Sequence, residues 1–155
     1  RIGDTIYFHG APASRLLKLA ADGAKVCITC TLLDGLVLAR SAFHSSMNYR
    51  SAVLFGVGRL VTDYDEQWAV MKAITEHVAK GRWDEVRYAT EKEAQSTKFV
   101  AVEIESASAK IRTGPPKDDE EDYALPIWAG VLPLAITPST PIPDPLLTPV
   151  APRSR

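Results

Sequence analysis

The segment from Tyr7 to Lys18 combines residue types that bind phosphate with a turn that can present them. Gly10 and Pro12 interrupt an alternating run, and Ser14 or Pro12 can then open a helix. Backbone N–H groups in the first turn of a helix favour an anion. Arg15 adds a planar fork suited to phosphate oxygens, and Lys18 adds a point charge one turn later.

A second segment, residues 47–56, places a similar set at the start of an apolar strand. Tyr49, Arg50 and Ser51 supply an aromatic ring, a guanidinium and a hydroxyl at neighbouring positions. An arginine at the end of a strand is usually solvated or paired with a carboxylate. If the fold brings the two segments together, the residue types predict a site for a phosphate attached to a flat aromatic ligand.

Periodicity predicts the elements that hold the first segment. Residues 5–9 alternate like a half-buried strand, in which Tyr7 and His9 share a face with Thr5. The following helix is expected to end at Asp22-Gly23. Its expected core contacts are Leu16, Leu17 and Leu19.

Five further strands or short apolar runs and two further helices follow. The expected strands are residues 25–32, 36–39, 49–57, 99–104 and 109–112, and the expected helices are 64–80 and a short one opened by a capping box at Thr90–Glu93. The long helix should bury a stripe of Trp68, Met71, Ile74 or Thr75, and Val78. Residues 123–134 are apolar and should pack on the body. Gly56 and Gly58 indicate a bulge or the close approach of another backbone.

Two cysteines, Cys27 and Cys30, have the spacing of a CxxC motif. They lie in an expected strand, where residues three apart point to opposite faces. This placement predicts neither a metal site nor a disulfide, and we expect both thiols to be packed as small apolar side chains.

Composition excludes several classes of function. The formal net charge of −1 does not favour nucleic acid or a membrane surface as a partner. No apolar run is long enough to span a membrane, and no signal peptide is visible, so we predict a cytoplasmic protein. No Ser-His-Asp or metal-ligand spacing is found, and His44 and His77 are weaker functional candidates than His9.

The order and spacing of these segments resemble a known family, the FMN-binding split barrels of the pyridoxamine 5'-phosphate oxidase-like superfamily, and within it the nitroimidazole-resistance-like flavoproteins. The resemblance covers residues 1 to about 134. It rests on residues 7–18, 26–31, 34–44, 47–51, 109–116 and 128–134. Such proteins usually have a helix and two strands before the equivalent of Asp4, so we expect this chain to be truncated at its N-terminus.

The resemblance implies a mainly β fold with flanking helices, a Greek-key antiparallel split barrel. It also implies a homodimer with FMN at the interface, and a small-molecule substrate. Residues 1–134 would form the FMN-binding domain and residues 135–155 a proline-rich tail, extended or disordered. The implied FMN-binding residues are Ser14, Arg15, Lys18, Tyr49, Arg50, Ser51, Lys110 and Arg112.

The leading functional hypothesis is therefore an FMN-dependent oxidoreductase. His9 matches a histidine that the family places near the flavin ring, and histidine as a residue type is suited to proton transfer. Two alternatives remain open. One is a flavin-binding or redox-sensing module without turnover, and the other is a haem or deazaflavin binder, as related split barrels also show.

Overall fold

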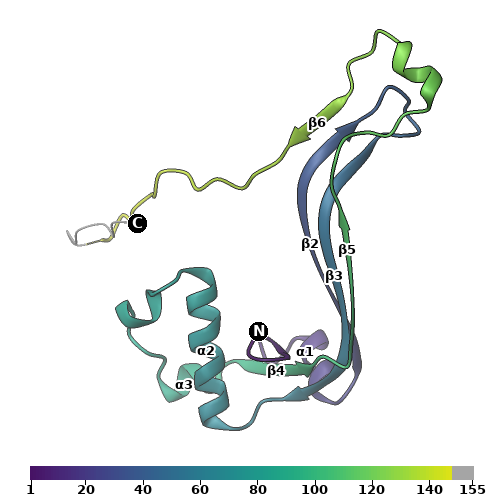
Figure 1. Ribbon diagram of the computed structural model, residues 1–155. Helices are drawn as coiled ribbons and strands as arrows, with labels where there is room; N and C mark the ends of the chain where they lie inside the picture. The colour runs from purple at the N-terminus through teal and green to yellow at the C-terminus, as the bar shows by residue number, and fades with distance from the viewer. Residues whose placement is uncertain (148–155) are drawn as a thin grey trace.

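The computed structural model describes residues 1–147 as a helical body from which a long β arm rises (Figure 1). The body contains β1 (Thr5–Gly10), α1 (Arg15–Ala21), α2 (Tyr64–Val78), the 3₁₀ helix η1 (Arg82–Glu85), α3 (Glu91–Gln95) and β4 (Lys98–Glu103). The arm contains β2 (Lys25–Leu38), β3 (Ser46–Leu60) and β5 (Ser106–Arg112), with the 3₁₀ helix η2 (Glu120–Ala124) near its tip and β6 (Gly130–Pro133) along β2.

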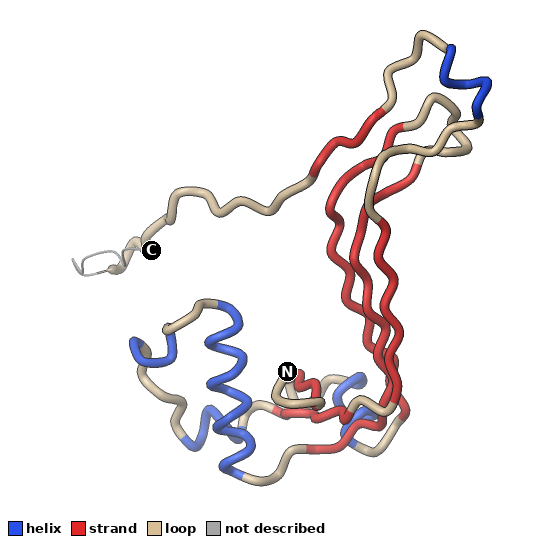
Figure 2. Tube along the Cα trace, in the orientation of Figure 1, coloured by secondary structure: helices blue, strands red, loops and turns tan. Residues whose placement is uncertain are grey.

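All strands form one antiparallel sheet in the order β1-β4-β3-β2-β6. Strand β5 lies off this path and pairs with residues 49–55 of β3. The long strand β3 belongs to both parts, because its end pairs with β4 while the rest pairs with β2 and β5. The fold class predicted from the resemblance is confirmed: the chain has a mostly antiparallel split-barrel architecture, with a sheet that does not close (Figure 2).

The core lies on both faces of β4. On one face Val100 and Val102 pack with Leu17 and Ala20 of α1, and Phe8 lies against them. On the other face Phe99 and Ala101 pack with Val61 and with Val70 of α2, joined by Tyr7, Met71 and Ile74. The alternation expected in β1 is therefore correct, since Phe8 faces α1 whereas Tyr7 faces α2.

Local signals set the ends of the helices. Ser14 caps α1, Asp63 caps α2, and Thr90 with Glu93 forms the expected capping box of α3. Gly23 follows α1 at a φ of 89°, in the left-handed region that favours glycine. The close approach predicted at the glycines is also found: a Cβ on Gly58 would lie 2.2 Å from the Ala20 carbonyl oxygen.

Several sequence-based expectations are wrong in detail. In α1, Leu17 and Ala20 are buried while Leu16 and Leu19 are exposed. The helix packs on the sheet with Ala20 directly over Gly58, so the Leu17–Ala20 side faces the sheet. In α2 the fully buried residue is Val70, and Val78 is exposed.

The expected strands 25–32 and 36–39 are one strand, β2, because Asp34 forms a bulge rather than a turn. The strand expected at residues 49–57 is longer at both ends, since β3 runs from Ser46 to Leu60.

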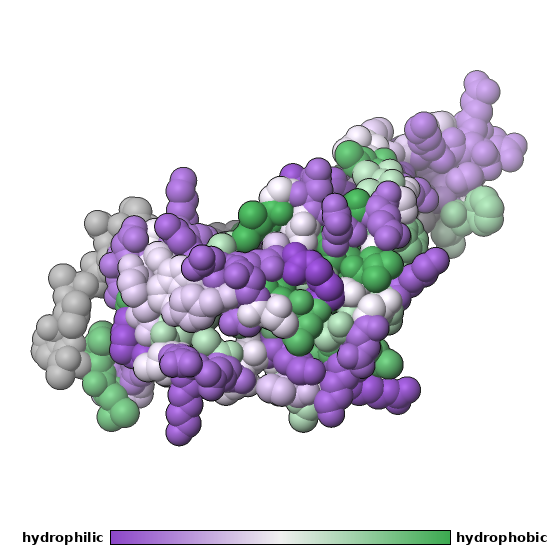
Figure 3. Space-filling model, turned by 90° about the horizontal axis from the view of Figure 1, so that it is seen from below, coloured by the Kyte–Doolittle hydropathy of each residue, from purple (hydrophilic) through white to green (hydrophobic). Residues whose placement is uncertain are grey.

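Apolar side chains are unusually exposed along the arm and beyond it. Both cysteines are free and exposed, contrary to the packing we expected. The apolar segment 123–134 pairs with β2 of the arm through β6, and its Trp128 is 68% exposed, so among residues 1–147 the segment does not show the packing on the body that we expected. Green apolar patches lie between purple hydrophilic residues on the face shown in Figure 3. The segment that follows β6 is extended, and residues 148–155 of the expected tail lie outside the described part of the chain.

The charged groups of the body include one partly buried network. Tyr7 donates to Glu66 at 2.8 Å, and Arg59 donates to both oxygens of the same carboxylate at 2.6 and 2.9 Å. Hydrogen bonding from Arg59 holds the pKa of Glu66 below its usual range, while burial raises the pKa of Tyr7. The network ties β1, β3 and α2 together.

Candidate functional site

The predicted phosphate ligands of the first segment lie at the start of α1. Ser14 accepts the Leu17 N–H at 3.5 Å, and Arg15 and Lys18 are exposed. Within residues 1–147, neither cation has a carboxylate or other side-chain partner. Two uncompensated positive charges and a hydroxyl therefore lie within one helical turn, an arrangement suited to an anion.

A second group of predicted ligands lies together on one face of the arm. The register pairs Tyr49 with Arg112 and Ser51 with Lys110, so these four side chains share a face. The Lys110 ammonium lies 6.0 Å from the centre of the Tyr49 ring. Arg112 donates to Asn48 Oδ1 at 2.6 Å, which fixes one edge of its guanidinium.

Arg50 is on the other face of β3 and already has a partner. Its guanidinium donates to both carboxylate oxygens of Asp34, at 2.8 and 2.9 Å. Hydrogen bonding between the two groups raises the pKa of Arg50 and lowers the pKa of Asp34. The bulge in β2 places Asp34 there, so the carboxylate partner that we considered for this arginine is present.

The structure does not bring the two predicted groups together within one chain. Gly58 of β3 lies against Ala20 of α1. Ser51 lies seven residues before Gly58 in β3, which corresponds to about 23 Å of strand. A phosphate held by α1 is therefore far from the polar face of its own arm.

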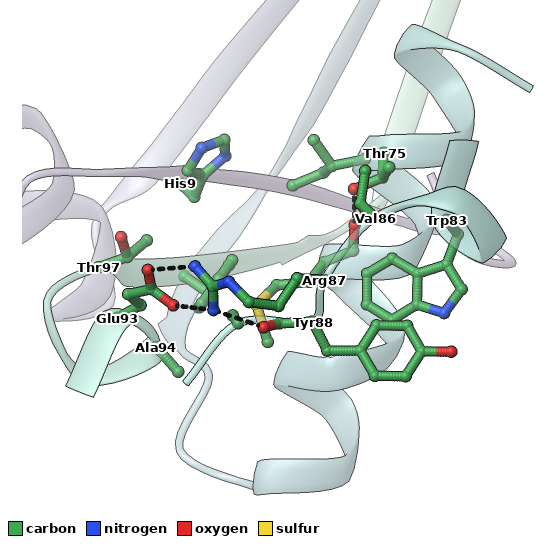
Figure 4. A pocket seen from close by; sticks show the side chains of 13 residues that line it. His9, Thr75, Trp83, Val86, Arg87, Tyr88, Glu93, Ala94 and Thr97 are labelled. Atoms are coloured by element: carbon green, nitrogen blue, oxygen red, sulfur yellow. Dashed lines mark hydrogen bonds and ion pairs between the residues drawn. The ribbon is translucent and has the colours of Figure 1, made fainter. Parts of the chain in front are cut away.

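His9 faces a cavity of about 390 Å³ between the strands β1 and β4 and the helices α2, η1 and α3 (Figure 4). Its ring centre lies 5.9 Å from that of Phe99, the residue paired with it in β4. Helix α1 packs on the opposite face of this sheet. His9 is thus close in sequence to the expected phosphate turn, but its side chain lies on the other face of the sheet.

Aromatic rings form one wall of the cavity. The sequence analysis did not predict that these rings belong to a site. Trp83 and Tyr88 are stacked with ring centres 5.0 Å apart. Trp68 contacts both edge-on, at 5.3 and 5.1 Å. Of these three residues the sequence analysis named only Trp68, and it expected Trp68 in the core. The segment after α2 has no periodic pattern that would predict where the rings of Trp83 and Tyr88 lie.

The rim of the cavity carries an ion pair that sequence reasoning also missed. Arg87 donates to both oxygens of Glu93 at 2.8 and 3.0 Å and to the Tyr88 carbonyl oxygen at 2.8 Å. The Thr90 N–H donates to the same carboxylate at 2.7 Å. These bonds, chiefly those from Arg87, lower the pKa of Glu93 to about 2. The signal in the sequence was an arginine three residues before the capping box.

The remaining histidines lie elsewhere. His44 is at the arm tip and contacts Asp119 at 3.2 Å, and His77 is exposed in the last turn of α2. In the part of the chain that the structure describes, no cluster of side chains could hold a metal ion, and no helix is long and apolar enough to cross a membrane.

Comparison with known proteins gives one family and several similar structures. The model of the family described as pyridoxamine 5'-phosphate oxidase matches residues 1–111. The flavocytochrome Anf3 from Azotobacter vinelandii is 41% identical, with a TM-score of 0.90 over 99% of this chain and 72% of the other. The FAD and haem binding protein from Mycobacterium smegmatis is 39% identical, with a TM-score of 0.91 over 98% of this chain and 76% of the other.

A protein named for 5-nitroimidazole antibiotic resistance, from Bacteroides thetaiotaomicron, has the same fold at 22% identity. Its TM-score is 0.53 over 70% of this chain and 62% of the other. No curated protein matches the chain. The family match spans most of the chain, and two solved relatives share about two residues in five. The chain therefore belongs to the pyridoxamine 5'-phosphate oxidase family.

Proposed function

We propose that this protein is a flavin-dependent oxidoreductase acting on a small molecule, and that Ser14, Arg15 and Lys18 hold the flavin phosphate. The observation that carries the proposal is the pair of cations at the start of α1, which have no partner among residues 1–147. Membership of the family supports a flavin as the anion. The bound flavin supplies the electron or hydride transfer, while the protein binds and orients it.

The flavin is predicted to be FMN by the sequence resemblance, whereas one relative is named for FAD. Both flavins carry a phosphate at the end of the ribityl chain, so the residues at α1 suit either one. The uncharged Ser14 hydroxyl and the two cations offer several donors to such a phosphate. The identity of the flavin is settled by extraction, because FMN and FAD separate on a column.

We propose further that a homodimer completes the site. The solvent-accessible surface of the chain is 11772 Å². A compact monomer of 16.9 kDa would expose about 7,700 Å², so this chain exposes far more surface than a compact monomer does. Exposed Leu32, Phe55 and Ile111 on the arm would be covered by a second copy. The arm of that copy would bring its polar face to α1. That face consists of Tyr49, Ser51, Lys110 and Arg112.

His9 would donate a proton to a substrate bound in the cavity that it faces, on the other face of the sheet from α1. Its imidazole faces the cavity and has no ionic partner within the described residues. Histidine is the side chain that most often serves as a general acid. The role makes no use of the partner chain.

A flavocytochrome is the second candidate, favoured by the two relatives that are named for haem or for a flavocytochrome. His9, which faces a cavity, would be the residue to hold the haem iron. A flavin-binding module without turnover is the other alternative.

The decisive experiment is purification followed by absorbance and cofactor extraction. Flavin bands with one flavin per chain, after loading with FMN or FAD where needed, are expected. Bleaching by NADPH and reoxidation by a quinone would show turnover and exclude the pure binding module. A Soret band would establish the flavocytochrome. A protein that binds neither FMN nor FAD would overturn the proposed function.

A further inference from the structure

A row of aromatic rings extends from the cavity wall to the surface of the body. Tyr88 lines the cavity, and its ring centre lies 5.1 Å from that of Trp68 in α2. Trp68 is stacked in turn on Tyr64, one helical turn earlier, with ring centres 6.2 Å apart. Tyr64 is 58% exposed and Tyr88 is 49% exposed, whereas Trp68 is half-buried. We call these three residues the aromatic face.

The polar atoms of the aromatic face are donors that have no acceptor in the described chain. Within residues 1–147, neither the Trp68 indole N–H nor the hydroxyl groups of Tyr64 and Tyr88 have a hydrogen-bond partner. Such side chains combine an apolar ring with a polar tip, and for this reason they are frequent at interfaces. The face therefore offers flat rings together with N–H and O–H donors.

The proline-rich segment 135–147 has the complementary chemistry. Proline fixes φ near the polyproline II value and lacks an N–H, and the residue before each proline is also held extended. The segment therefore presents proline rings and carbonyl acceptors, and it loses little conformational entropy when it binds. Its prolines are Pro138, Pro141, Pro143 and Pro145. The first two are three residues apart, so they lie on one edge of a helix with three residues per turn.

Within its own chain this segment leaves its apolar side chains uncovered. Ile136, Ile142 and Leu146 are 98%, 94% and 91% exposed. The segment is joined to the arm at Leu134, whose N–H donates to the Asp34 carbonyl oxygen at 3.0 Å. From there it leads away from the arm as an extended chain (Figure 1). Three exposed branched side chains on an extended segment indicate that a further surface covers them.

Proline-rich segments bind to grooves lined by aromatic side chains, where the preformed extended backbone docks on the rings. We infer that the aromatic face binds the segment 135–147 of a second copy of this chain. Both partners are present in the described chain, yet the segment and its own aromatic face both stay exposed. The occupant therefore comes from another copy. Residues 135–143 carry no charge, so the contact is apolar.

The reach of the segment allows this contact between copies. The ten residues 135–144 span about 31 Å as polyproline II, which is comparable to the diameter of a small domain. The contact uses neither the flavin residues nor the cavity beside His9. It adds to the proposed homodimer an exchange of one segment from each copy, and it stands on its own observations.

The test is a disulfide cross-link between two different chains. Both chains carry Cys27→Ser and Cys30→Ser, because the native thiols are exposed. One chain also carries Tyr64→Cys and the other Ile142→Cys, and a tag on one of them separates mixed dimers from dimers of one chain. After oxidation of the mixture, we expect at least tenfold more mixed dimer than with Val78→Cys in place of Tyr64→Cys. Val78 is the matched control, since it lies on the same helix, is 80% exposed, and is about 21 Å from Tyr64 along the axis.

A synthetic peptide of residues 134–147 tests what the face recognises. The peptide should compete for the aromatic face and suppress the mixed dimer. A peptide with Pro138→Ala and Pro141→Ala should compete at least threefold less well, because it loses the preset extended backbone. Raising the salt concentration to about 1 M should change the yield of mixed dimer by less than about twofold, because the contact is apolar.

Equal yields with Tyr64→Cys and Val78→Cys, or no mixed dimer with either, would overturn the inference. A chain carrying both Tyr64→Cys and Ile142→Cys that closes the disulfide within itself and forms no covalent dimer would overturn it too, since the segment would then lie on its own body. Equal competition by decaproline would refute the choice of this segment as the occupant. A cross-link in protein that takes up neither FMN nor FAD would remove the proposed function alone, whereas flavin uptake without the cross-link would remove this inference alone.

Discussion

Two arginines that look equivalent in the sequence should differ in their effect on flavin affinity. Arg15 has no partner in the described chain, so all of its donors are available to a phosphate. Arg50 gives its Nε and one Nη to Asp34 at 2.9 and 2.8 Å. We expect Arg15→Ala to weaken flavin binding by at least tenfold, the lower end of the range for a charged hydrogen bond, because the side chain is exposed.

The same argument gives smaller effects for the other two variants. Lys18→Ala should weaken binding about threefold, since a flexible ammonium loses more freedom when it binds. Arg50→Ala should change the dissociation constant by less than about twofold. Both arginine variants remove one exposed cation, so the change in net charge of the protein is the same in the two variants.

The assay is titration of flavin into the flavin-free protein, followed by quenching of flavin fluorescence at low and at high salt. The thermal midpoint of each variant is measured alongside, so that unfolding is not mistaken for lost affinity. The gap between Arg15→Ala and the parent should narrow at high salt. The reasoning is refuted if Arg50→Ala weakens binding as much as Arg15→Ala, or if Arg15→Ala binds flavin like the parent.

Three further predictions concern the body. Gly58→Val should lower the free energy of unfolding by about 2 kcal/mol in denaturant titrations, because its Cβ would clash with the Ala20 carbonyl oxygen; parental stability would contradict it. Glu66→Gln should lower the free energy of unfolding at neutral pH and leave it unchanged well below pH 4.5. The pKa of Glu66 is lowered from 4.5 in the folded state, so the stabilisation from its carboxylate is lost as the pH falls through the folded-state pKa. Unfolding curves at pH 7 and pH 3 check this, and an equal difference at both would argue against it. His9→Gln should keep the flavin bound but slow turnover per flavin on the order of 10²-fold; unchanged turnover would remove His9 from the mechanism.

Local signals in the sequence were sufficient for the helix starts and most strands, whereas the long helix expected to run to residue 80 ends at Val78. Ser14, Asp63 and the Thr90–Glu93 box act within three or four residues, so they can be read without the fold. The family resemblance added the topology. The buried face of α1 could not be read this way, because five leucine or alanine positions compete and the packing of Ala20 against Gly58 decides among them.

The site was predicted less well than the fold, for the same physical reason. The partner of Arg50 is sixteen residues away, and only the bulge at Asp34 brings the two side chains into contact. The face that His9 occupies follows from alternation in β1, but α1 lies on the other face because of long-range packing. The cavity itself depends on the segment between η1 and α3, which has no periodic pattern.

The pairing of β1 with β4 has a consequence for how the body folds. Thr5 is paired with Glu103, and every other pair in this ladder joins residues almost as far apart. The hairpin of β2 and β3, in contrast, joins neighbours in the chain and can form early. Residues as distant as those of the β1–β4 ladder meet late, because the entropy of closing the loop opposes them. Ile6 and Phe8 thus remain uncovered while the arm assembles, and this interval is when the chain is most exposed to aggregation.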